Sequence, residues 1–175
     1  MSATGTRRTG HPITLADGTL TRTREAAPAD LGPVQALHRR CSAGSRAMRY
    51  HAGTPGLSAA GWRLLCDPQR GTTLVTTTAH RTDRVIAMTN VMRTDRWGVG
   101  EFAVLIEDAW QRKGLGTALA AHAAEVARRI GLHTLTAAVD AANVPMLQVL
   151  ENLHAPPGRA TGPVIDVEIP LWRGR

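Results

Sequence analysis

Six segments of the chain have the alternating or β-branched pattern that is typical of β-strands. They cover residues 19–25, 72–79, 85–92, 101–107, 132–139 and 164–169. In the fourth segment, Phe102, Val104 and Ile106 fall on one face, whereas Glu101 and Leu105 fall on the other. Turns that contain Gly, Asp or Pro separate the segments, so the pattern predicts a sheet of short strands.

Three further segments repeat apolar residues every three or four positions, which is the period of an amphipathic helix. They cover residues 31–41, 115–130 and 146–153. We expect Asp30 to cap the first helix, Gly131 to end the second and Asn143 to cap the third, where Pro145 is tolerated in the first turn. A shorter helix is predicted over residues 58–66.

The order of these elements predicts one α/β domain with a mixed central sheet and helices beside it. A length of 175 residues agrees with a single domain. Residues 1–18 have no hydrophobic period and are predicted to be a flexible basic tail, which leaves 19–172 as the domain. Residues 42–57 are interpreted as a polar loop.

The chain is strongly basic, with a net charge of +7 and a pI of about 11.1. Lys113 is the one lysine among 21 basic residues, and the other 20 are arginines. The planar guanidinium group of arginine is well suited to bind phosphate. Two cysteines and histidines without ligand spacing predict neither a disulfide framework nor a metal site. No apolar run approaches the length of about 18 residues that a membrane span needs, so we expect a cytoplasmic protein with no membrane partner.

Residues 106–117, IEDAWQRKGLGT, carry the most specific signal in the sequence. Gly114 and Gly116 follow Arg112 and Lys113, between a predicted strand and a predicted helix. The first N–H groups of a helix attract anions, and glycines let the backbone approach a phosphate closely. The turn is therefore predicted to hold a pyrophosphate, although neither the full Walker pattern nor the full dinucleotide pattern is present.

The spacing Gln111-x-x-Gly114-x-Gly116 resembles the CoA-binding signature of the GNAT superfamily of N-acyltransferases. Asn143 and the apolar helix after it resemble a second landmark of that superfamily. Residues 100–111 are also similar to the bacterial protein-lysine acetyltransferase branch. The resemblance implies a single GNAT-like α/β domain whose parallel strands splay around acetyl-CoA or another acyl-CoA, with no metal.

The resemblance also implies individual roles. Glu101 matches the position of the base that takes a proton from the attacking amine. Glu107 and Asp108 would lie nearer the phosphates and are poorly placed for that task. The implied cofactor-binding residues are Val104, Leu105 and Ile106 through their main chain, Gln111, Arg112, Lys113, Gly114, Leu115, Gly116 and Thr117 at the pyrophosphate, and Asn143 at the cofactor arm.

Leu150 departs from the pattern of many GNAT enzymes, which place a tyrosine seven residues after the asparagine as an acid for the departing thiolate. A thiol with a pKa near 8.5 can leave without an acid, so thioester chemistry remains open. Tyr50 is the one tyrosine of the chain. It would reach the site only if the early polar loop folded over it.

Three functions remain open at this stage. The first is an N-acetyltransferase that acts on a primary amine of a small molecule or protein, and the cations of the polar loop suggest an acidic or phosphorylated acceptor. The second uses aminoacyl-tRNA as the acyl donor, because a basic surface suits a tRNA backbone. The third is a non-catalytic CoA-binding sensor. The basic residues that tRNA would use are Arg39, Arg40, Arg46, Arg49, Arg128 and Arg129, of which the last two are expected to face solvent.

Overall fold

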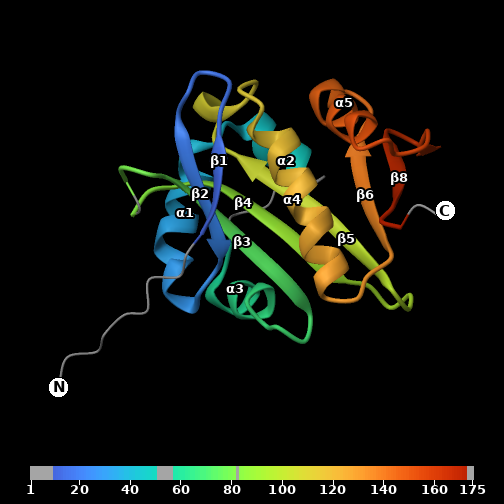
Figure 1. The fold of residues 1–175 in the computed structure, drawn as a ribbon, viewed down its shortest axis with the longest axis horizontal. Coiled ribbons are helices and arrows are strands. Elements are labelled where there is room, and N and C mark those ends of the chain that lie inside the picture. Colours follow the sequence, from blue (N-terminus) through green and yellow to red (C-terminus); the bar gives the residue numbers. More distant parts are fainter. Residues whose placement is uncertain (1–9, 51–56, 82, 173–175) are drawn as a thin grey trace.

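The computed structural model describes residues 10–50, 57–81 and 83–172, which form a sheet between two layers of helices (Figure 1). The strands are β1 (His11–Thr14), β2 (Leu20–Glu25), β3 (Gly71–Thr78), β4 (Val85–Arg93), β5 (Val99–Ile106), β6 (Thr134–Asp140), β7 (Arg159–Thr161) and β8 (Val164–Pro170). The helices are α1 (Leu31–Arg40), α2 (Ala43–Tyr50), α3 (Ala59–Leu65), α4 (Leu115–Arg129) and α5 (Val144–Asn152), with 3₁₀ turns η1 (Pro28–Asp30) and η2 (Asp108–Trp110). No helix within the described ranges combines the length and apolar character needed to cross a membrane.

The sheet opens between two of its strands, β5 and β6. The strand order is β1-β2-β3-β4-β5-β6-β8-β7, and every neighbouring pair is antiparallel except β5 and β6, which α4 connects as a crossover. The β5–β6 ladder holds three residue pairs and ends where Glu101 lies opposite Thr136. Beyond that pair the two strands diverge toward their C-terminal ends (Figure 1).

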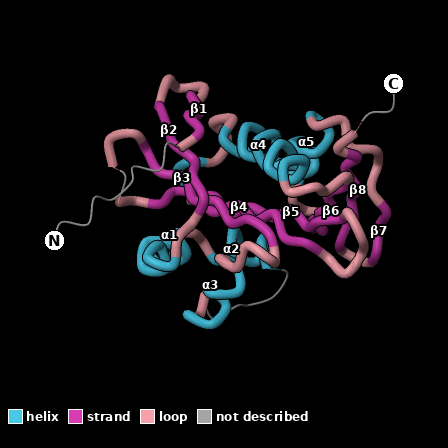
Figure 2. The backbone as a smooth tube through the Cα atoms, turned by 60° about the horizontal axis from the view of Figure 1, so that its bottom comes forward, coloured by secondary structure: helices cyan, strands magenta, loops and turns pink. Residues whose placement is uncertain are grey.

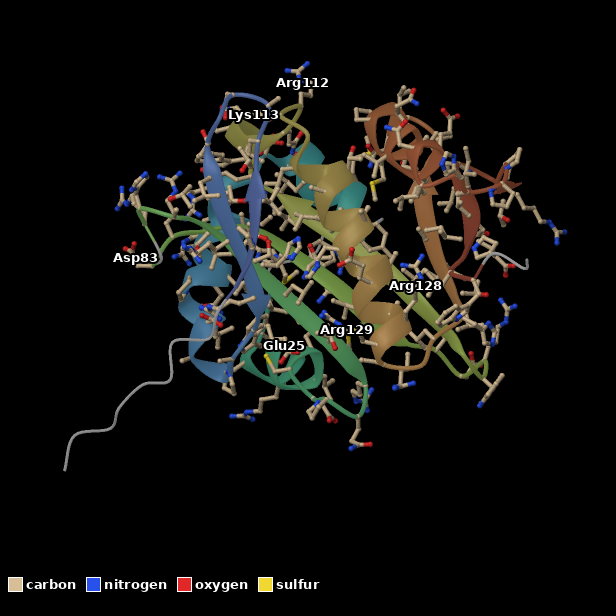
Figure 3. All side chains as sticks on the ribbon, viewed as in Figure 1. Glu25, Asp83, Arg112, Lys113, Arg128 and Arg129 are labelled. Atoms are coloured by element: carbon tan, nitrogen blue, oxygen red, sulfur yellow. The ribbon has the colours of Figure 1, made fainter. Side chains whose placement is uncertain are left out.

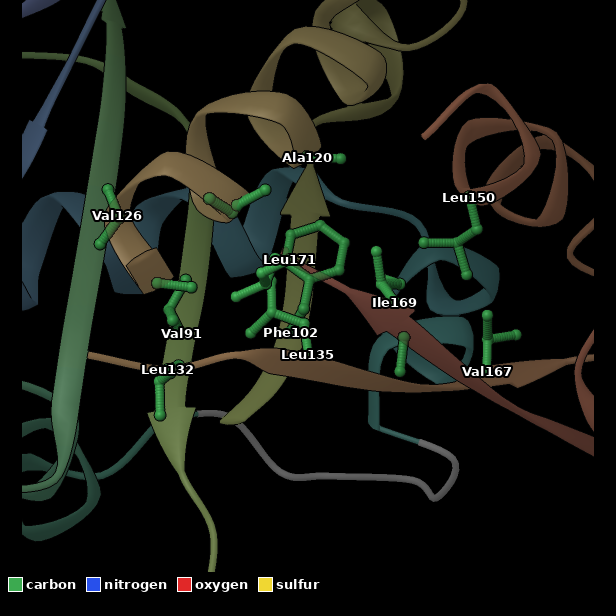
Figure 4. Close-up of a cluster of buried hydrophobic side chains, with 14 of the residues drawn as sticks. Val91, Phe102, Ala120, Val126, Leu132, Leu135, Leu150, Val167, Ile169 and Leu171 are labelled. Atoms are coloured by element: carbon green, nitrogen blue, oxygen red, sulfur yellow. The ribbon is translucent and has the colours of Figure 1, made fainter. Parts of the chain in front are cut away.

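Helices α4 and α5 cover one face of the sheet, and α1, α2 and α3 cover the other (Figure 2). Under α4 and α5, Phe102 packs with Leu135 and Leu150 in a buried cluster (Figure 4). On the opposite face, Leu105 packs with Leu37 of α1. Alternate residues of β5 therefore contribute to two hydrophobic cores, as their predicted alternation requires.

The predicted α/β fold is confirmed, including the mixed sheet and the splayed strands. All six predicted strands and all four predicted helices are present, with ends that differ by a few residues at most. The structure adds two short strands, β1 and β7, and the helix α2.

The predicted tail over residues 1–18 is wrong for His11–Thr14, which form β1 and pair with β2. Ile13 and Leu15 are the buried apolar side chains of this hairpin arm, so too few positions alternate to give a strand signal. Residues 1–9 of the predicted tail lie outside the described part of the chain.

The predicted loop over residues 42–57 is wrong for Ala43–Tyr50, which form α2, and residues 51–56 lie outside the described ranges. Ser42 provided a signal that was missed, because its Oγ accepts a hydrogen bond from the Ser45 N–H at 3.1 Å, as a helix-capping serine does. No residue of α2 is fully buried, so its sequence lacks a clear stripe of apolar residues that would predict a helix.

Asp30 precedes α1 as predicted but does not cap it. Its carboxylate accepts a hydrogen bond from the Ala27 N–H at 2.8 Å and two from the Arg24 guanidinium at 2.7 Å. The bidentate arginine is a stronger partner than a helix amide, so the carboxylate joins β2 to the start of α1 instead.

Candidate functional site

A cleft of about 690 Å³ lies where β5 and β6 diverge. Residues 101–106 of β5 line one side, and residues 137–139 of β6 line the other. Residues from both halves of α2 and from the first turn of α4 also line the cleft. It therefore joins Glu101, at the last β5–β6 pair, to the predicted phosphate-binding turn.

The main-chain groups of β5 point alternately toward β4 and toward the cleft. The Glu107 N–H donates to the Ile86 carbonyl of β4 at 3.0 Å, so the odd-numbered residues of this stretch face β4. Val104 and Ile106 consequently turn their main-chain groups toward the cleft. Leu105 was predicted to bind in the same way, but its main chain faces β4 and its side chain is buried under α1.

The glycine turn leaves the N-terminus of α4 without a side-chain cap. Gly114 occupies the N-cap position with φ +82°, a left-handed conformation that favours glycine. A Cβ on Gly116 would meet Ile106 Cδ1 and Val149 Cγ2 at 3.6 Å, which is an ordinary contact distance. Packing within the chain does not demand glycine at position 116, and Gly116 lines the cleft, where a ligand has room.

The remaining predicted residues of the turn differ in how they can contribute. Leu115 is fully buried beneath the turn, so it can offer a ligand its amide but not its side chain. Thr117 and Arg112 line the cleft, and Arg112 is an exposed residue with φ +57° (Figure 3). Lys113 is held by the β1–β2 turn, because its Nζ lies 3.0 Å from Asp17 Oδ2.

Lys113 is further fixed by the ring of Trp110, whose centroid lies 5.1 Å from Nζ. Hydrogen bonds from Thr19 and Lys113 lower the pKa of Asp17 to about 2. The lysine thus anchors the phosphate turn to the β1–β2 hairpin. Arg112, by contrast, makes no side-chain hydrogen bond or ion pair with the described part of the chain and is directed outward at the tip of the turn (Figure 3).

Gln111 and Asp108 connect this turn to α2. Gln111 Nε2 donates to Ser45 Oγ at 3.0 Å and to the Ile106 carbonyl at 2.9 Å. The Asp108 carboxylate accepts from the Ser42 N–H, the Ser42 hydroxyl and the Ser45 hydroxyl at 2.7–2.9 Å. Burial raises the pKa of Asp108, but these hydrogen bonds outweigh that effect and lower it overall. Both side chains therefore position the turn.

Glu107 is committed to a buried ion-pair network. Its carboxylate accepts hydrogen bonds from Arg40 Nε at 2.9 Å and from Arg84 Nη2 at 2.5 Å, and its side chain is 7% exposed. Both carboxylate oxygens are therefore engaged by arginines, and Glu107 does not line the cleft. Neither Glu107 nor Asp108 is free to act as the base.

Glu101 differs from these two carboxylates because its side chain is exposed and lines the cleft. It belongs to the last pair of the β5–β6 ladder, where the cleft begins. Arg49 and Tyr50 of α2 line the cleft with it. The sequence prediction missed Arg49 as a site residue and left Tyr50 dependent on a loop movement; α2 brings both to the cleft.

Tyr50 is oriented by a buried histidine of α1. His38 Nδ1 donates to the Val34 carbonyl at 2.8 Å, so its Nε2 accepts the hydrogen bond from the Tyr50 hydroxyl at 2.5 Å. Burial lowers the pKa of His38, and the nearby Arg49 and Arg46 lower it further. The Tyr50 hydroxyl is thereby directed toward α1, and burial raises its pKa.

Asn143 precedes α5 and Leu150 lies within it, but the two residues are in different environments. Asn143 lines the cleft and caps α5, with its Oδ1 accepting from the Met146 N–H at 3.3 Å. Leu150 is 2% exposed and packs in the cluster under α4 and α5. The position at which many GNAT enzymes carry an acidic tyrosine therefore belongs to the core here.

We expect Leu150→Tyr to destabilise the fold without raising turnover. The larger ring would overfill a packed core and bring a hydroxyl there, at a cost of about 1–3 kcal/mol in the free energy of unfolding. Denaturant unfolding measures the first effect and a thiol-release assay the second. A stable variant with faster turnover would show instead that residue 150 reaches the reacting atoms.

The comparisons with known proteins agree with this geometry. Residues 37–155 match the model of the acetyltransferase (GNAT) family. The structure superposes on the GNAT domain of PAT from S. lividans with a TM-score of 0.83 and 26% identity, covering 92% of this chain and 96% of that one. No curated protein sequence matches the chain significantly.

Two more distant structures share the fold. A putative acetyltransferase from Salmonella typhimurium, solved with acetyl-CoA, gives a TM-score of 0.64 at 18% identity, with 88% of this chain and 95% of that chain covered. The ribosomal-protein-S18-alanine N-acetyltransferase from Escherichia coli gives 0.66 at 16% identity, with 89% and 96% covered. Within the described residues, no group of three or more His, Cys, Asp or Glu side chains is arranged to hold a metal ion.

Proposed function

Because this chain belongs to the GNAT acetyltransferase family, we propose that it transfers an acyl group, most simply acetyl, from acyl-CoA to a primary amine, with Glu101 as the base. One observation carries the proposal. The cleft between the diverging strands has an exposed carboxylate at its narrow end and the uncapped N-terminus of α4 at its other end. This arrangement supports a thioester beside Glu101 and a pyrophosphate beside Gly116.

Residues along the cleft would supply the contacts that acyl-CoA needs. The amides at the start of α4 and the exposed Arg112 would hold the pyrophosphate. The main-chain groups of Val104 and Ile106 would bond the pantetheine arm, which Asn143 would meet from the opposite side. Gly116, which lines the cleft at the start of α4, would leave room for a phosphate oxygen beside these amides.

Glu101 would remove the proton that prevents an amine from attacking. An alkylamine with a pKa near 10.4 is unprotonated in only about one molecule in 2,500 at pH 7. Glu101 takes the proton directly or through a water, the amine nitrogen forms a bond to the carbonyl carbon, and the carbon–sulfur bond breaks. The sulfur leaves as a thiolate, since its low basicity makes an acid at position 150 unnecessary.

No specific observation favours aminoacyl-tRNA as the donor. Arg128 and Arg129 are exposed on α4, as predicted (Figure 3). Four of the six arginines predicted for a tRNA surface nevertheless donate hydrogen bonds within the chain. They are Arg40 to Glu107, Arg46 to the carbonyls of His38 and Cys41, Arg49 to Asn90, and Arg128 to the carbonyl of Leu171. Much of the positive charge is thus used in holding the fold together.

A thiol-release screen across primary amines, with acetyl-CoA as donor, tests the proposal. We expect release that depends on the amine, together with CoA binding that persists at moderate salt. An aminoacyl-tRNA transfer assay runs beside it. CoA binding without release for any amine would favour the sensor, and transfer from aminoacyl-tRNA would favour the second donor.

A further inference from the structure

Arg49 places a positive charge in the wall of the cleft, and no described residue forms an ion pair with it. It lies on α2 and lines the cleft together with Glu101. Its Nη2 donates to Asn90 Oδ1 at 2.8 Å, and its guanidinium lies 4.8 Å from the centroid of the Tyr50 ring. Its Nε is buried with no hydrogen-bond partner in the described part of the chain.

The neighbours of Arg49 do not neutralise it. Among the described residues, no carboxylate lies within the 4.0 Å of an ion pair with its guanidinium, whereas Arg40 and Arg84 both have Glu107. Burial lowers the pKa of Arg49, and the more distant charges of Tyr50 and Glu101 act in the opposite direction. A partly buried charge without a contacting counter-charge is costly, so a ligand that supplies the anion would be bound favourably.

The position of Arg49 separates it from the phosphate-binding turn. Its partner Asn90 pairs with Ala103, which lies two residues after Glu101 and shares its face of the sheet. Ala103 is three residues, or about 10 Å along the strand, before Ile106. Ile106 contacts Gly116 from the opposite face, under α4. An anion at Arg49 would therefore lie at the transfer end of the cleft, away from the pyrophosphate.

We propose that Arg49 binds a carboxylate carried by the amine acceptor, which makes the acceptor a zwitterionic amino acid or a close analogue. This rests on the proposed function. Glu101 attracts the ammonium group that it will deprotonate, and Arg49 attracts the carboxylate a few atoms away. The two opposite charges on one face of the cleft match the two charges of such a substrate, and the guanidinium fork suits a carboxylate in particular.

The test compares acceptors that differ only in the carboxylate, with acetyl-CoA held constant. Straight-chain ω-amino acids are each measured beside the alkylamine of equal length, and α-amino acids beside their amides. For at least one pair, we expect the wild type to have kcat/KM at least 10-fold higher for the carboxylate, mainly through KM. Arg49→Gln should reduce this preference about 10- to 100-fold and should affect the neutral amines and CoA affinity much less.

Two further variants separate binding from folding. Arg49→Lys keeps the charge but loses the fork, so it should recover part of the preference. Arg63→Gln removes an equal charge from the exposed side of α3 and should match the wild type. Equal loss for charged and neutral amines in Arg49→Gln, or no preference in the wild type, would overturn the proposal.

A second arm identifies the source of the carboxylate by comparing succinyl-CoA with acetyl-CoA on neutral amines. We expect no preference for succinyl-CoA that depends on Arg49. Such a preference would move the carboxylate from the acceptor to the acyl group and overturn the acceptor assignment. Absence of thiol release with every amine, despite CoA binding, would instead contradict the proposed function on which the inference rests.

Discussion

Glu101→Gln should lower turnover at pH 7 by about 10²–10⁴-fold, which is the usual contribution of a positioned general base. The amide keeps the shape of the side chain but cannot accept the proton. The side chain is exposed at the narrow end of the cleft, so the fold and the affinity for CoA should remain intact. Because an amine deprotonates without help at high pH, the deficit should shrink as the pH approaches 10. Initial rates of thiol release across this pH range measure both effects.

The chain contains a matched control for this variant. Glu168 on β8 pairs with Thr136, the same residue that Glu101 pairs with from the other side, so the two carboxylates stand in one row of the sheet. Glu168 bonds Arg96 at the surface and does not line the cleft. Glu168→Gln should therefore keep wild-type turnover. Wild-type turnover in Glu101→Gln at pH 7 would remove Glu101 from the mechanism.

Gly116→Val should abolish most of the affinity for acyl-CoA while the protein still folds. A Cβ at this position would meet its protein neighbours at 3.6 Å, so the fold tolerates the first carbon. The branched side chain would extend into the space beside the α4 amides and displace the phosphate. Isothermal titration with CoA and thermal unfolding without it measure the two quantities separately.

Gly32→Val is the corresponding control, because Gly32 is also the second residue of its helix, α1. A Cβ there would meet no atom within 4 Å. Both variants place a valine at the second position of a helix, and Pro33 after residue 32 makes the control the harsher test of folding, so a loss of CoA affinity confined to Gly116→Val isolates the phosphate site. Unchanged CoA affinity in a folded Gly116→Val would contradict a pyrophosphate at this turn.

Sequence reasoning succeeded where a hydrophobic period or a turn motif was long enough. The alternation placed Phe102 and Leu105 on opposite faces of β5, which the structure confirms by packing them in two different cores, and Gly114 marked the start of α4. It failed for β1, which has too few alternating residues, and for α2, which buries no whole side chain.

The unpredicted part of the site depends on contacts between distant segments. Arg49 meets Asn90 across 41 residues, and Ser42 meets Asp108 across 66. Such pairs leave no local periodicity. The orientation of the Leu105 main chain was also out of reach, because it follows from how β5 pairs with β4.

The hydrogen bonds that join Asp108 and Gln111 to Ser42 and Ser45 have a further consequence for kinetics. They join the helix that carries Arg49 to the turn that would hold the pyrophosphate, so ordering one segment restricts the other. Any such coupling is thermodynamically reciprocal: if CoA strengthens acceptor binding by some factor, the acceptor strengthens CoA binding equally. The first substrate to bind already orders part of both segments, so the second loses less conformational entropy and should bind more tightly. We therefore expect a sequential order of addition, with synergy between the two substrates.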